Sequence, residues 1–313
     1  TTLYRLAKDS KVVKALICAA RNGKKVTAVV ELMARFDEES NIKWSKRMQE
    51  EGVNVIFGVE GLKIHSKLCL ITTSKGNIAC VGTGNFHEGN AKVYTDYLMM
   101  TARPRIVNEV AKVFDFIDRP FSQVRFNELM VSPNSMKTKL LRLFDTEIKN
   151  AKAGKEAWVR IKINHITDTD MVNKIYAASK AGVKVDIVVR GNCSLVPGVS
   201  DNVKAVGIID RYLEHSRILI FCNDGKPRYY IGSADWMPRN LVNRIEVMTP
   251  VYDEDLRKDL LRTVEYGLRD TTNGRIVDGK GTNQIQPVTE GGAPFRSQEK
   301  LHQAYLQEYT QEK

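Results

Sequence analysis

The sequence lacks the marks of a disulfide-rich, zinc-binding or membrane-spanning protein. Its five cysteines are odd in number and form no C-x-x-C pair, and most lie in apolar runs. We therefore expect reduced core residues rather than a disulfide framework or a structural zinc site. No apolar run approaches the roughly 20 residues that a membrane-spanning helix requires. No secretory signal is recognisable, which favours a cytoplasmic protein.

The chain also lacks a starting methionine and opens directly on a strand pattern, so we expect it to be part of a longer protein. Its 313 residues suffice for two domains, and its apolar and charged fractions of 42% and 27% argue against general disorder. The 48 Lys and Arg exceed the 37 Asp and Glu, giving a net charge of +11. This excess favours a polyanionic partner.

Two parts of the chain repeat one another. The segments HSKLCLI and GTGNF return later as HSRILIF and GSADW, at a constant shift of 150 residues. The shift pairs His65 with His215, Lys67 with Arg217, Gly82 with Gly232, Asn85 with Asp235, and Asp96 with Glu246. Upstream, a shift of 159 pairs residues 13–31 with residues 172–190. The pattern indicates an internal duplication.

The sequence pattern of each copy predicts strands that alternate with helices, and this alternation is typical of an α/β sandwich. In the first copy, strands are expected at residues 2–6, 78–82 and 97–101, in VTAVVEL and at His65. In the second copy, strands are expected at residues 158–163, 229–232 and 244–249, in VDIVVR and at His215. Amphipathic helices are expected at about 10–22 and 168–181, and Ser135 is expected to cap a helix between the copies. We predict domains at 1–128 and 129–313, the second ending in a polar surface tail (about 271–313) with a last helix at 297–310.

The duplicated residues suit phosphate chemistry. Lys67 and Arg217 can neutralise phosphate oxygens, Asn85 can donate hydrogen bonds, and a neutral imidazole can attack phosphorus. Asp96 and Glu246 can each accept the far N–H of a histidine and fix its tautomer. Because the residues recur in equivalent places, we expect one site built from both copies.

A plainer interpretation exists for every one of these residues. A single H-x-K is usually a half-exposed histidine beside a surface lysine, and only its repetition at five paired positions favours function. Tyr94 could be a packing aromatic, Arg190 could pair with Glu31, and Arg35 could be a solvated charge in ARFDEE.

The motif H-x-K followed by G-[ST]-x-N resembles the phospholipase D superfamily, whose members form a phosphohistidine at a two-copy interface. The resemblance implies two tandem phospholipase D-like α/β sandwich domains. The chain departs from the usual pattern because Thr72 and Cys222 stand where an Asp follows the lysine, and because Arg217 replaces the second lysine. These departures argue against ordinary phosphodiesterase chemistry.

Longer stretches resemble the C-terminal half of bacterial polyphosphate kinase. They include VVELMARFDEESNIKW, GLKIHSKLCLI, GTGNFHEGNAKVYTDY, RGNCSLVPG, SDNVKAVGIIDRYLEHSRILIF and GSADWMPRN. The similarity runs from Thr1 to about residue 270. The N-terminal domains of that family have no counterpart in this sequence.

This resemblance implies a role for each matching residue. His65 matches the phosphorylated histidine and His215 the second active-site histidine, while Tyr94 and Arg190 match nucleotide-binding positions. Arg5 and Arg35 match positions associated with Mg²⁺. Since arginine cannot ligate a cation, we expect these two to hold phosphate oxygens that bind Mg²⁺.

The implied reaction is the reversible transfer of the γ-phosphate of ATP to the end of inorganic polyphosphate. The implied partners are ATP or ADP, polyphosphate and Mg²⁺, and no nucleic acid is expected. We expect the full-length enzyme to be a homo-oligomer in the cytoplasm. The sequence leaves open whether that enzyme associates with a membrane. Two alternatives remain: a phospholipase D-like phosphodiesterase or nuclease, and a polyanion-binding fragment without turnover.

Overall fold

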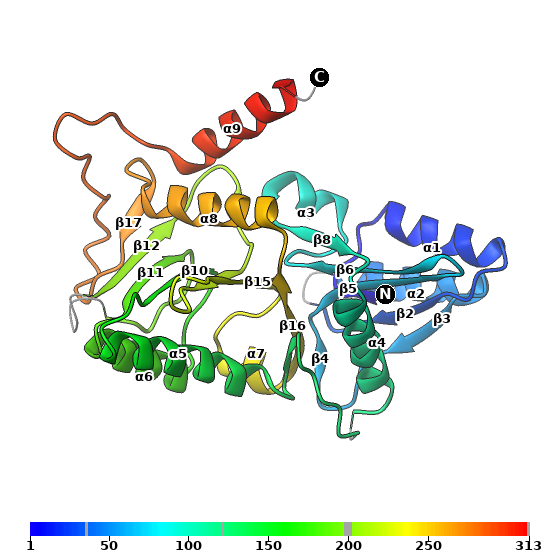
Figure 1. Cartoon of the computed structure of the whole chain (residues 1–313). Coiled ribbons are helices and arrows are strands. Elements are labelled where there is room, and N and C mark those ends of the chain that lie inside the picture. Colours follow the sequence, from blue (N-terminus) through cyan, green and yellow to red (C-terminus); the bar gives the residue numbers. More distant parts are fainter. Residues whose placement is uncertain (35–36, 121, 197–201, 312–313) are drawn as a thin grey trace. The chain divides into compact units, whose positions relative to one another are not determined.

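The computed structural model describes residues 1–34, 37–120, 122–196 and 202–311 (Figure 1). Arg35, which the sequence predicts at the magnesium site, lies outside the described residues. Within the described ranges, no helix is both long enough and apolar enough to cross a membrane.

The chain divides into two compact units that do not follow chain order. Unit 1 contains residues 1–137, 231–234 and 238–249, and unit 2 contains residues 138–230, 235–237 and 250–313. The boundary predicted between residues 128 and 129 therefore lies inside unit 1. Two short segments of the second copy also belong to unit 1, and one of them carries Glu246.

Unit 1 begins with a parallel sheet and two helices. The strands are β1 (Thr2–Leu3), β2 (Thr27–Val30) and β3 (Asn54–Phe57), and the helices are α1 (Lys11–Arg21) and α2 (Glu38–Glu50). Helix α1 starts where Ser10 accepts a hydrogen bond from the Val13 backbone N–H at 3.2 Å. It ends before Gly23, whose φ of +74° suits glycine. Leu3, Val13 and Met48 lie in the core between these elements.

A second sheet of unit 1 is antiparallel and carries the first histidine motif. Its strands are β5 (Lys67–Thr73), β6 (Gly76–Gly82) and β8 (Leu98–Thr101), while α3 (Glu88–Val93) and β7 (Tyr94–Thr95) connect β6 to β8. Helix α4 (Pro104–Asp118) packs against this sheet (Figure 1). It buries Ile106, Val110 and Val113 in a core that also contains Leu68 and Val81. His65 directly follows β4 (Lys63–Ile64) and is separated from β5 by Ser66, so it lies outside the strand.

Unit 1 also contains short elements that bring Glu246 to the first copy. Strand β16 (Arg244–Val251) pairs in parallel with β4 (Lys63–Ile64) and antiparallel with β9 (Met130–Ser132). Its residues 244–249 belong to this unit, as does α7 (Pro238–Val242). Since β4 immediately precedes His65, its pairing with β16 sets the register between the histidine and Glu246.

Unit 2 is built around one larger sheet. Its strands follow the order β17 (Gly274–Ile276), β12 (Val203–Ile208), β11 (Lys184–Val189), β10 (Trp158–Ile163), β14 (Ile218–Phe221) and β15 (Arg228–Gly232), whose last two residues are counted with unit 1. Helix α8 (Glu254–Leu268) lies on one face, and α5 (Met136–Lys152) and α6 (Thr169–Lys180) lie on the other (Figure 1). The unit further contains β13 (Leu213–Glu214) and α9 (Ser297–Gln311).

The hydroxyl of Thr2 in unit 1 makes hydrogen bonds where unit 2 has a ladder of backbone hydrogen bonds between two strands. In unit 2, β10 pairs with β14 through antiparallel backbone hydrogen bonds. In unit 1, the hydroxyl of buried Thr2 donates to the Ser66 carbonyl at 2.7 Å and accepts from the Leu68 N–H at 2.9 Å. Thr2 therefore fixes the start of the strand that follows His65.

The structure confirms the α/β class and the tandem arrangement of two α/β copies, and it corrects several details. The predicted strand at residues 158–163 has the predicted bounds. Ser135 does not cap α5, because its buried hydroxyl has no hydrogen-bond partner among the described residues. All five cysteines are free. Cys80 and Cys222 are buried as predicted, but Cys69 and Cys193 are only half-buried and Cys18 is exposed on α1. The sequence analysis predicted neither α2 nor β17.

Thr2→Val should destabilise the protein by about 1–3 kcal/mol, because it leaves a buried carbonyl and a buried N–H without their partner. Urea unfolding measures the change. Thr2→Ser is the matched control: it keeps the hydroxyl and loses one methyl group, worth about 0.8 kcal/mol. Equal losses for the two variants would contradict the role of the hydroxyl.

Candidate active site

The candidate site in unit 1 contains a histidine paired with a buried glutamate. Nδ1 of His65 lies 2.9 Å and 3.0 Å from the two carboxylate oxygens of Glu246. The backbone N–H of His65 donates to the Ile245 carbonyl at 3.1 Å, so the strand that carries Glu246 also holds the histidine backbone. If Nδ1 donates its proton to Glu246, the lone pair of the ring is on Nε2.

Glu246 is fully buried and is held by further donors. The Ser233 hydroxyl donates to one carboxylate oxygen, and the Asn240 amide donates to the other at 2.6 Å. Burial raises the pKa of Glu246 to about 7, against the opposing effects of Lys67 and of these hydrogen bonds. The carboxyl group therefore changes its protonation state near neutral pH.

The local structure around Glu246 is repeated around Asp96. The Thr83 hydroxyl donates to Asp96 at 2.6 Å and accepts from the Tyr97 N–H at 2.9 Å. In the second copy, Ser233 donates to Glu246 in the same way and accepts from the Val247 N–H at 3.2 Å. The sequence repeat thus reproduces individual hydrogen bonds.

The second glycine of GTGN has a steric reason. A Cβ at Gly84 would lie 2.1 Å from an Asp96 carboxylate oxygen, closer than real atoms approach. The glycine therefore lets the carboxylate lie against the backbone.

Lys67 is buried beside His65. Its ammonium group donates to the His65 carbonyl and lies 5.3 Å from the centre of the Tyr4 ring. The same ring meets the imidazole of His65 edge to face, with 4.8 Å between the ring centres. Tyr4 was not predicted at the site, although it immediately precedes Arg5 in the sequence.

Arg5 lies near an acidic side chain. Its Nε is 3.5 Å from a carboxylate oxygen of Asp37, and its guanidinium carbon is 5.9 Å from the centre of the Tyr4 ring. The described ranges contain no group of three or more His, Cys, Asp or Glu side chains placed to hold a metal ion.

In unit 2, Arg217 binds Asp235 with two nitrogens. The distances are 3.3 Å from Nε and 3.1 Å from Nη2, and both side chains are buried. Nη1 of Arg217 donates to the His215 carbonyl at 2.8 Å and lies 3.3 Å from both ring nitrogens of His215. Each copy thus folds its cation back onto the carbonyl of its own histidine.

Asn164, which follows β10, forms hydrogen bonds with other predicted residues of unit 2. Its backbone N–H donates to Asp235 at 3.0 Å, and its side-chain carbonyl accepts from Nε of Arg190 at 3.0 Å. Its amide group also lies 3.4 Å from the His215 carbonyl. Asn164 was not predicted; the available signal was a polar residue directly after a buried strand.

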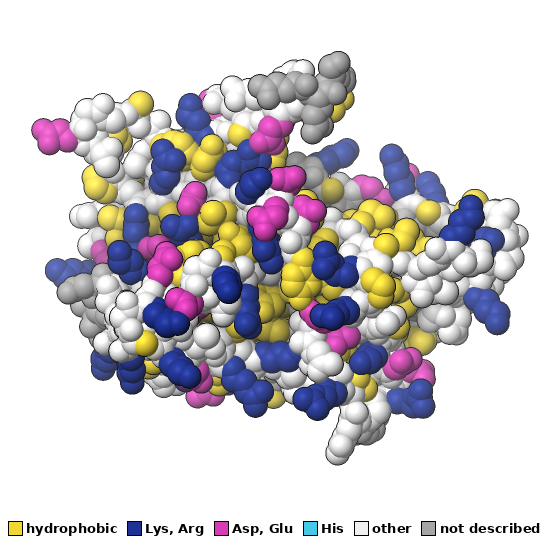
Figure 2. Space-filling view, viewed as in Figure 1, with side chains coloured by type: hydrophobic (Ala, Val, Ile, Leu, Met, Phe, Trp, Pro, Cys, Tyr) yellow, Lys and Arg dark blue, Asp and Glu magenta, His cyan; other side chains and the backbone are white. Residues whose placement is uncertain are grey.

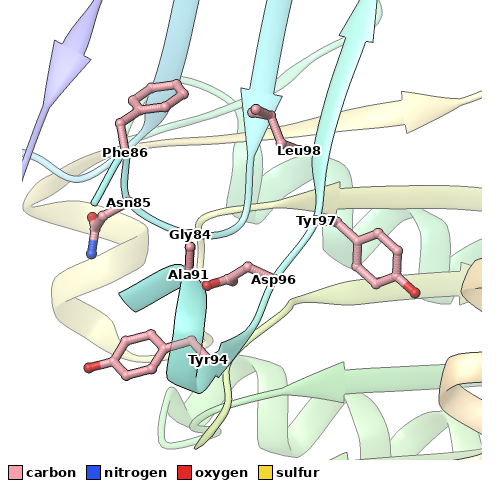
Figure 3. A pocket seen from close by; sticks show the side chains of 8 residues that line it. All are labelled: Gly84, Asn85, Phe86, Ala91, Tyr94, Asp96, Tyr97 and Leu98. Atoms are coloured by element: carbon pink, nitrogen blue, oxygen red, sulfur yellow. The ribbon is translucent and has the colours of Figure 1, made fainter. Parts of the chain in front are cut away.

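Tyr94 and Asn85 line a hollow of about 240 Å³ in unit 1 (Figure 3). Phe86, Asp96 and Tyr97 also line it. Figure 3 shows the Asp96 carboxylate directed toward the Gly84 backbone, with the two tyrosine rings on opposite sides of it. The buried side-chain oxygen of Asn85 has no hydrogen-bond partner among the described residues.

Positive charge is spread over the face of the molecule that Figure 2 shows. On the face in Figure 2, Lys and Arg side chains lie among acidic, neutral and apolar ones in both units. The net charge of +11 is therefore not gathered into one patch on that face.

Some of the predicted residues thus form a group in each unit. His65, Lys67 and Glu246 lie together in unit 1, and His215, Arg217, Asp235 and Arg190 lie together in unit 2. The predicted convergence of the two histidines on one site stays a prediction. The sequence analysis missed the groups that hold these residues in place: Tyr4, Asn164, Ser233 and Asn240.

Two family models match the chain. Residues 1–123 match "Polyphosphate kinase C-terminal domain 1", and residues 129–298 match "Polyphosphate kinase C-terminal domain 2". These matches confirm the resemblance that the sequence motifs indicated.

Individual proteins are similar over nearly the whole chain. Polyphosphate kinase of Vibrio cholerae is 50% identical over 289 residues, which are 90% of this chain and 41% of that protein. Polyphosphate kinase of Escherichia coli K12 is 48% identical, over 91% of this chain and 42% of that protein. The crystal structure of polyphosphate kinase from Porphyromonas gingivalis is 38% identical, with a TM-score of 0.89 over 100% of this chain and 48% of that one. The chain thus spans about two-fifths of the length of these curated relatives.

Glu246→Gln should change how stability depends on pH. Below pH 4.5 the carboxyl is protonated in both folded and unfolded protein; between pH 4.5 and about 7 only the unfolded protein ionises it. Stability therefore falls as pH rises through this window. Relative to Glu246→Gln, the wild type should lose about 2–3 kcal/mol of unfolding free energy between pH 5 and pH 8.

Urea unfolding of both proteins at several pH values measures this difference. A difference that stays constant or grows in favour of the wild type as pH rises would contradict a protonated Glu246 in the folded state.

Proposed function

Because the chain belongs to the polyphosphate kinase family, we propose that its residues carry out the reversible transfer of the ATP γ-phosphoryl group to the end of inorganic polyphosphate. The observation that carries this proposal is the pairing of His65 Nδ1 with buried Glu246 at 2.9 Å. A histidine oriented in this way can act as a nucleophile at its other nitrogen. The names of the matching relatives support the substrates.

The reaction has two steps. The lone pair on Nε2 of His65 attacks the γ-phosphorus, the bond from phosphorus to the β–γ bridging oxygen breaks, and its electron pair leaves with ADP. A terminal oxygen of polyphosphate then attacks the same phosphorus, and the P–N electron pair returns to Nε2. Throughout, the proton stays on Nδ1 and is donated in a hydrogen bond to the Glu246 carboxylate. The negative charge of this carboxylate stabilises the positive ring of the phosphohistidine.

The protonation state of Glu246 decides which imidazole tautomer is present. An ionised carboxylate accepts the Nδ1 proton and leaves Nε2 nucleophilic. A protonated carboxyl can instead donate to Nδ1, which puts the remaining ring proton on Nε2 and blocks attack. Because burial raises the pKa of Glu246 to about 7, the active tautomer is favoured as pH rises through neutrality.

Cationic side chains stabilise the charge that develops on the transferring group. In this proposal Lys67 and Arg217 bind phosphoryl oxygens beside their histidines, and Arg190 and Tyr94 bind the nucleotide. Arg5 and Arg35 hold phosphates that carry Mg²⁺, so the ion arrives with ATP as part of the substrate. Asn85 and Asp96 support the nucleotide pocket, and Asp235 supports Arg217.

His215 completes the proposed mechanism. In this proposal it contacts the nucleotide and stabilises the ADP leaving group. The full-length enzyme is expected to work as a homo-oligomer in the cytoplasm, on ATP and polyphosphate and not on nucleic acid.

His65→Ala should abolish phosphoenzyme formation, because no other residue supplies the nucleophile in this mechanism. The measurement is incorporation of γ-³²P from labelled MgATP into the protein, followed by acid treatment, which should release the label from wild type. His302→Ala is the matched control, since His302 is exposed on α9. That variant should label as wild type does.

Undiminished labelling of the His65→Ala protein would remove His65 from the nucleophilic role. The same reactions distinguish the alternatives. ADP together with lengthened polyphosphate supports the kinase, whereas a nucleotide monoester released from a diester substrate would identify a phosphodiesterase.

A further inference from the structure

The segment just before His215 is held by a side chain from far along the sequence. The side-chain oxygen of Gln298, in the first turn of α9, accepts from the Tyr212 N–H at 2.9 Å. The side-chain amide donates back to the Tyr212 carbonyl at 2.8 Å. One glutamine therefore satisfies both backbone groups of Tyr212, as a neighbouring strand would.

The same amide extends its contacts to the residue that adjoins His215. Nε2 of Gln298 donates to Oε1 of Glu214 at 2.6 Å. Oε2 of Glu214 pairs with buried Lys162 at 2.8 Å, and Lys162 donates to the Ser216 hydroxyl at 2.6 Å. Residues 214 and 216, on either side of the histidine, are thus fixed by a chain of contacts that begins at Gln298.

Gln298 itself is held in place by its neighbours. Arg296 pairs with Asp210, and this contact keeps the pKa of the Asp210 carboxyl low. Buried Asp270 accepts hydrogen bonds from the Ser297 backbone at 2.7 Å and from its hydroxyl at 2.6 Å. Arg296, just before α9, and Ser297 and Gln298, its first two residues, therefore each contact other parts of unit 2, and Gln298 reaches the segment before His215.

We propose that Gln298 is a positioning residue for His215. It fixes the backbone of residues 212–216, so that the imidazole and Arg217 are presented to the nucleotide in one conformation. This inference rests on the proposed function, in which His215 contacts the nucleotide. It also gives a role to the segment after residue 270, which the sequence analysis interpreted as a tail over the surface.

Gln298→Ala tests the inference, with Gln307→Ala as the matched control because Gln307 is exposed on the same helix. In steady-state assays of the protein, Gln298→Ala should raise KM for ATP about tenfold, the effect of losing one hydrogen bond of about 1.4 kcal/mol to the nucleotide. The value of kcat should fall as well, because in the proposed mechanism His215 stabilises the leaving ADP, whereas KM for polyphosphate should stay within about twofold of wild type. Gln307→Ala should leave all three unchanged.

Two outcomes would overturn the inference. If Gln298→Ala matches Gln307→Ala in KM and kcat, Gln298 does not position the site. If Gln298→Ala lowers the melting temperature and the active fraction while KM for ATP is unchanged, Gln298 only attaches α9.

An activity-independent measurement separates this inference from the proposed function. With ¹³C-histidine labelling of this chain, Gln298→Ala should shift the ring signals of His215 and leave those of His65 and His87 unchanged. Unmoved His215 signals would contradict positioning. If the wild type shows no ATP turnover but Gln298→Ala still shifts the His215 signals, the proposed reaction is wrong and the positioning role of Gln298 is retained.

Discussion

The proposed chemistry depends on a buried pair of side chains, His65 and Glu246. The imidazole needs an acceptor at Nδ1 if Nε2 is to carry its lone pair, and Glu246 supplies one at 2.9 Å. Burying a carboxylate is unfavourable, which is why the pKa of Glu246 rises to about 7 and why Ser233 and Asn240 donate to it. The strand pairing of β4 with β16 and the Thr2 hydroxyl hold the histidine segment from its two ends.

Duplication explains why two such groups exist, and substitution explains why they differ. Both copies use a hydroxyl to hold an acid and fold a cation onto the carbonyl of their own histidine. In the second copy Arg217 is neutralised by Asp235, whereas the counterpart of Asp235 in the first copy is the uncharged Asn85. The electrostatic surroundings of the two histidines therefore differ. In the proposed reaction this difference suits one histidine to act as the nucleophile and the other to stabilise the leaving group.

Much of the fold follows from local patterns in the sequence. The strand at residues 158–163 and the start of the last helix at Ser297 were predicted correctly, because apolar runs and helical periodicity report local structure. The repeat likewise indicated which residues are equivalent. It could not indicate that the carboxylate beside His65 belongs to the other copy, because strand pairing across 181 residues leaves no local signal. The contact of Gln298 with the histidine segment escaped prediction for the same reason, in a stretch whose composition resembles a surface tail.

The most direct test of the account is to identify the ring nitrogen that carries the phosphoryl group. After reaction of ¹⁵N-histidine-labelled protein with MgATP, the peptide containing His65 can be isolated in alkali and its phosphorus–nitrogen coupling measured by NMR. The pairing of Nδ1 with Glu246 predicts phosphorylation at Nε2. Phosphorylation at Nδ1 of His65, or at another residue, would contradict the central role of the pair.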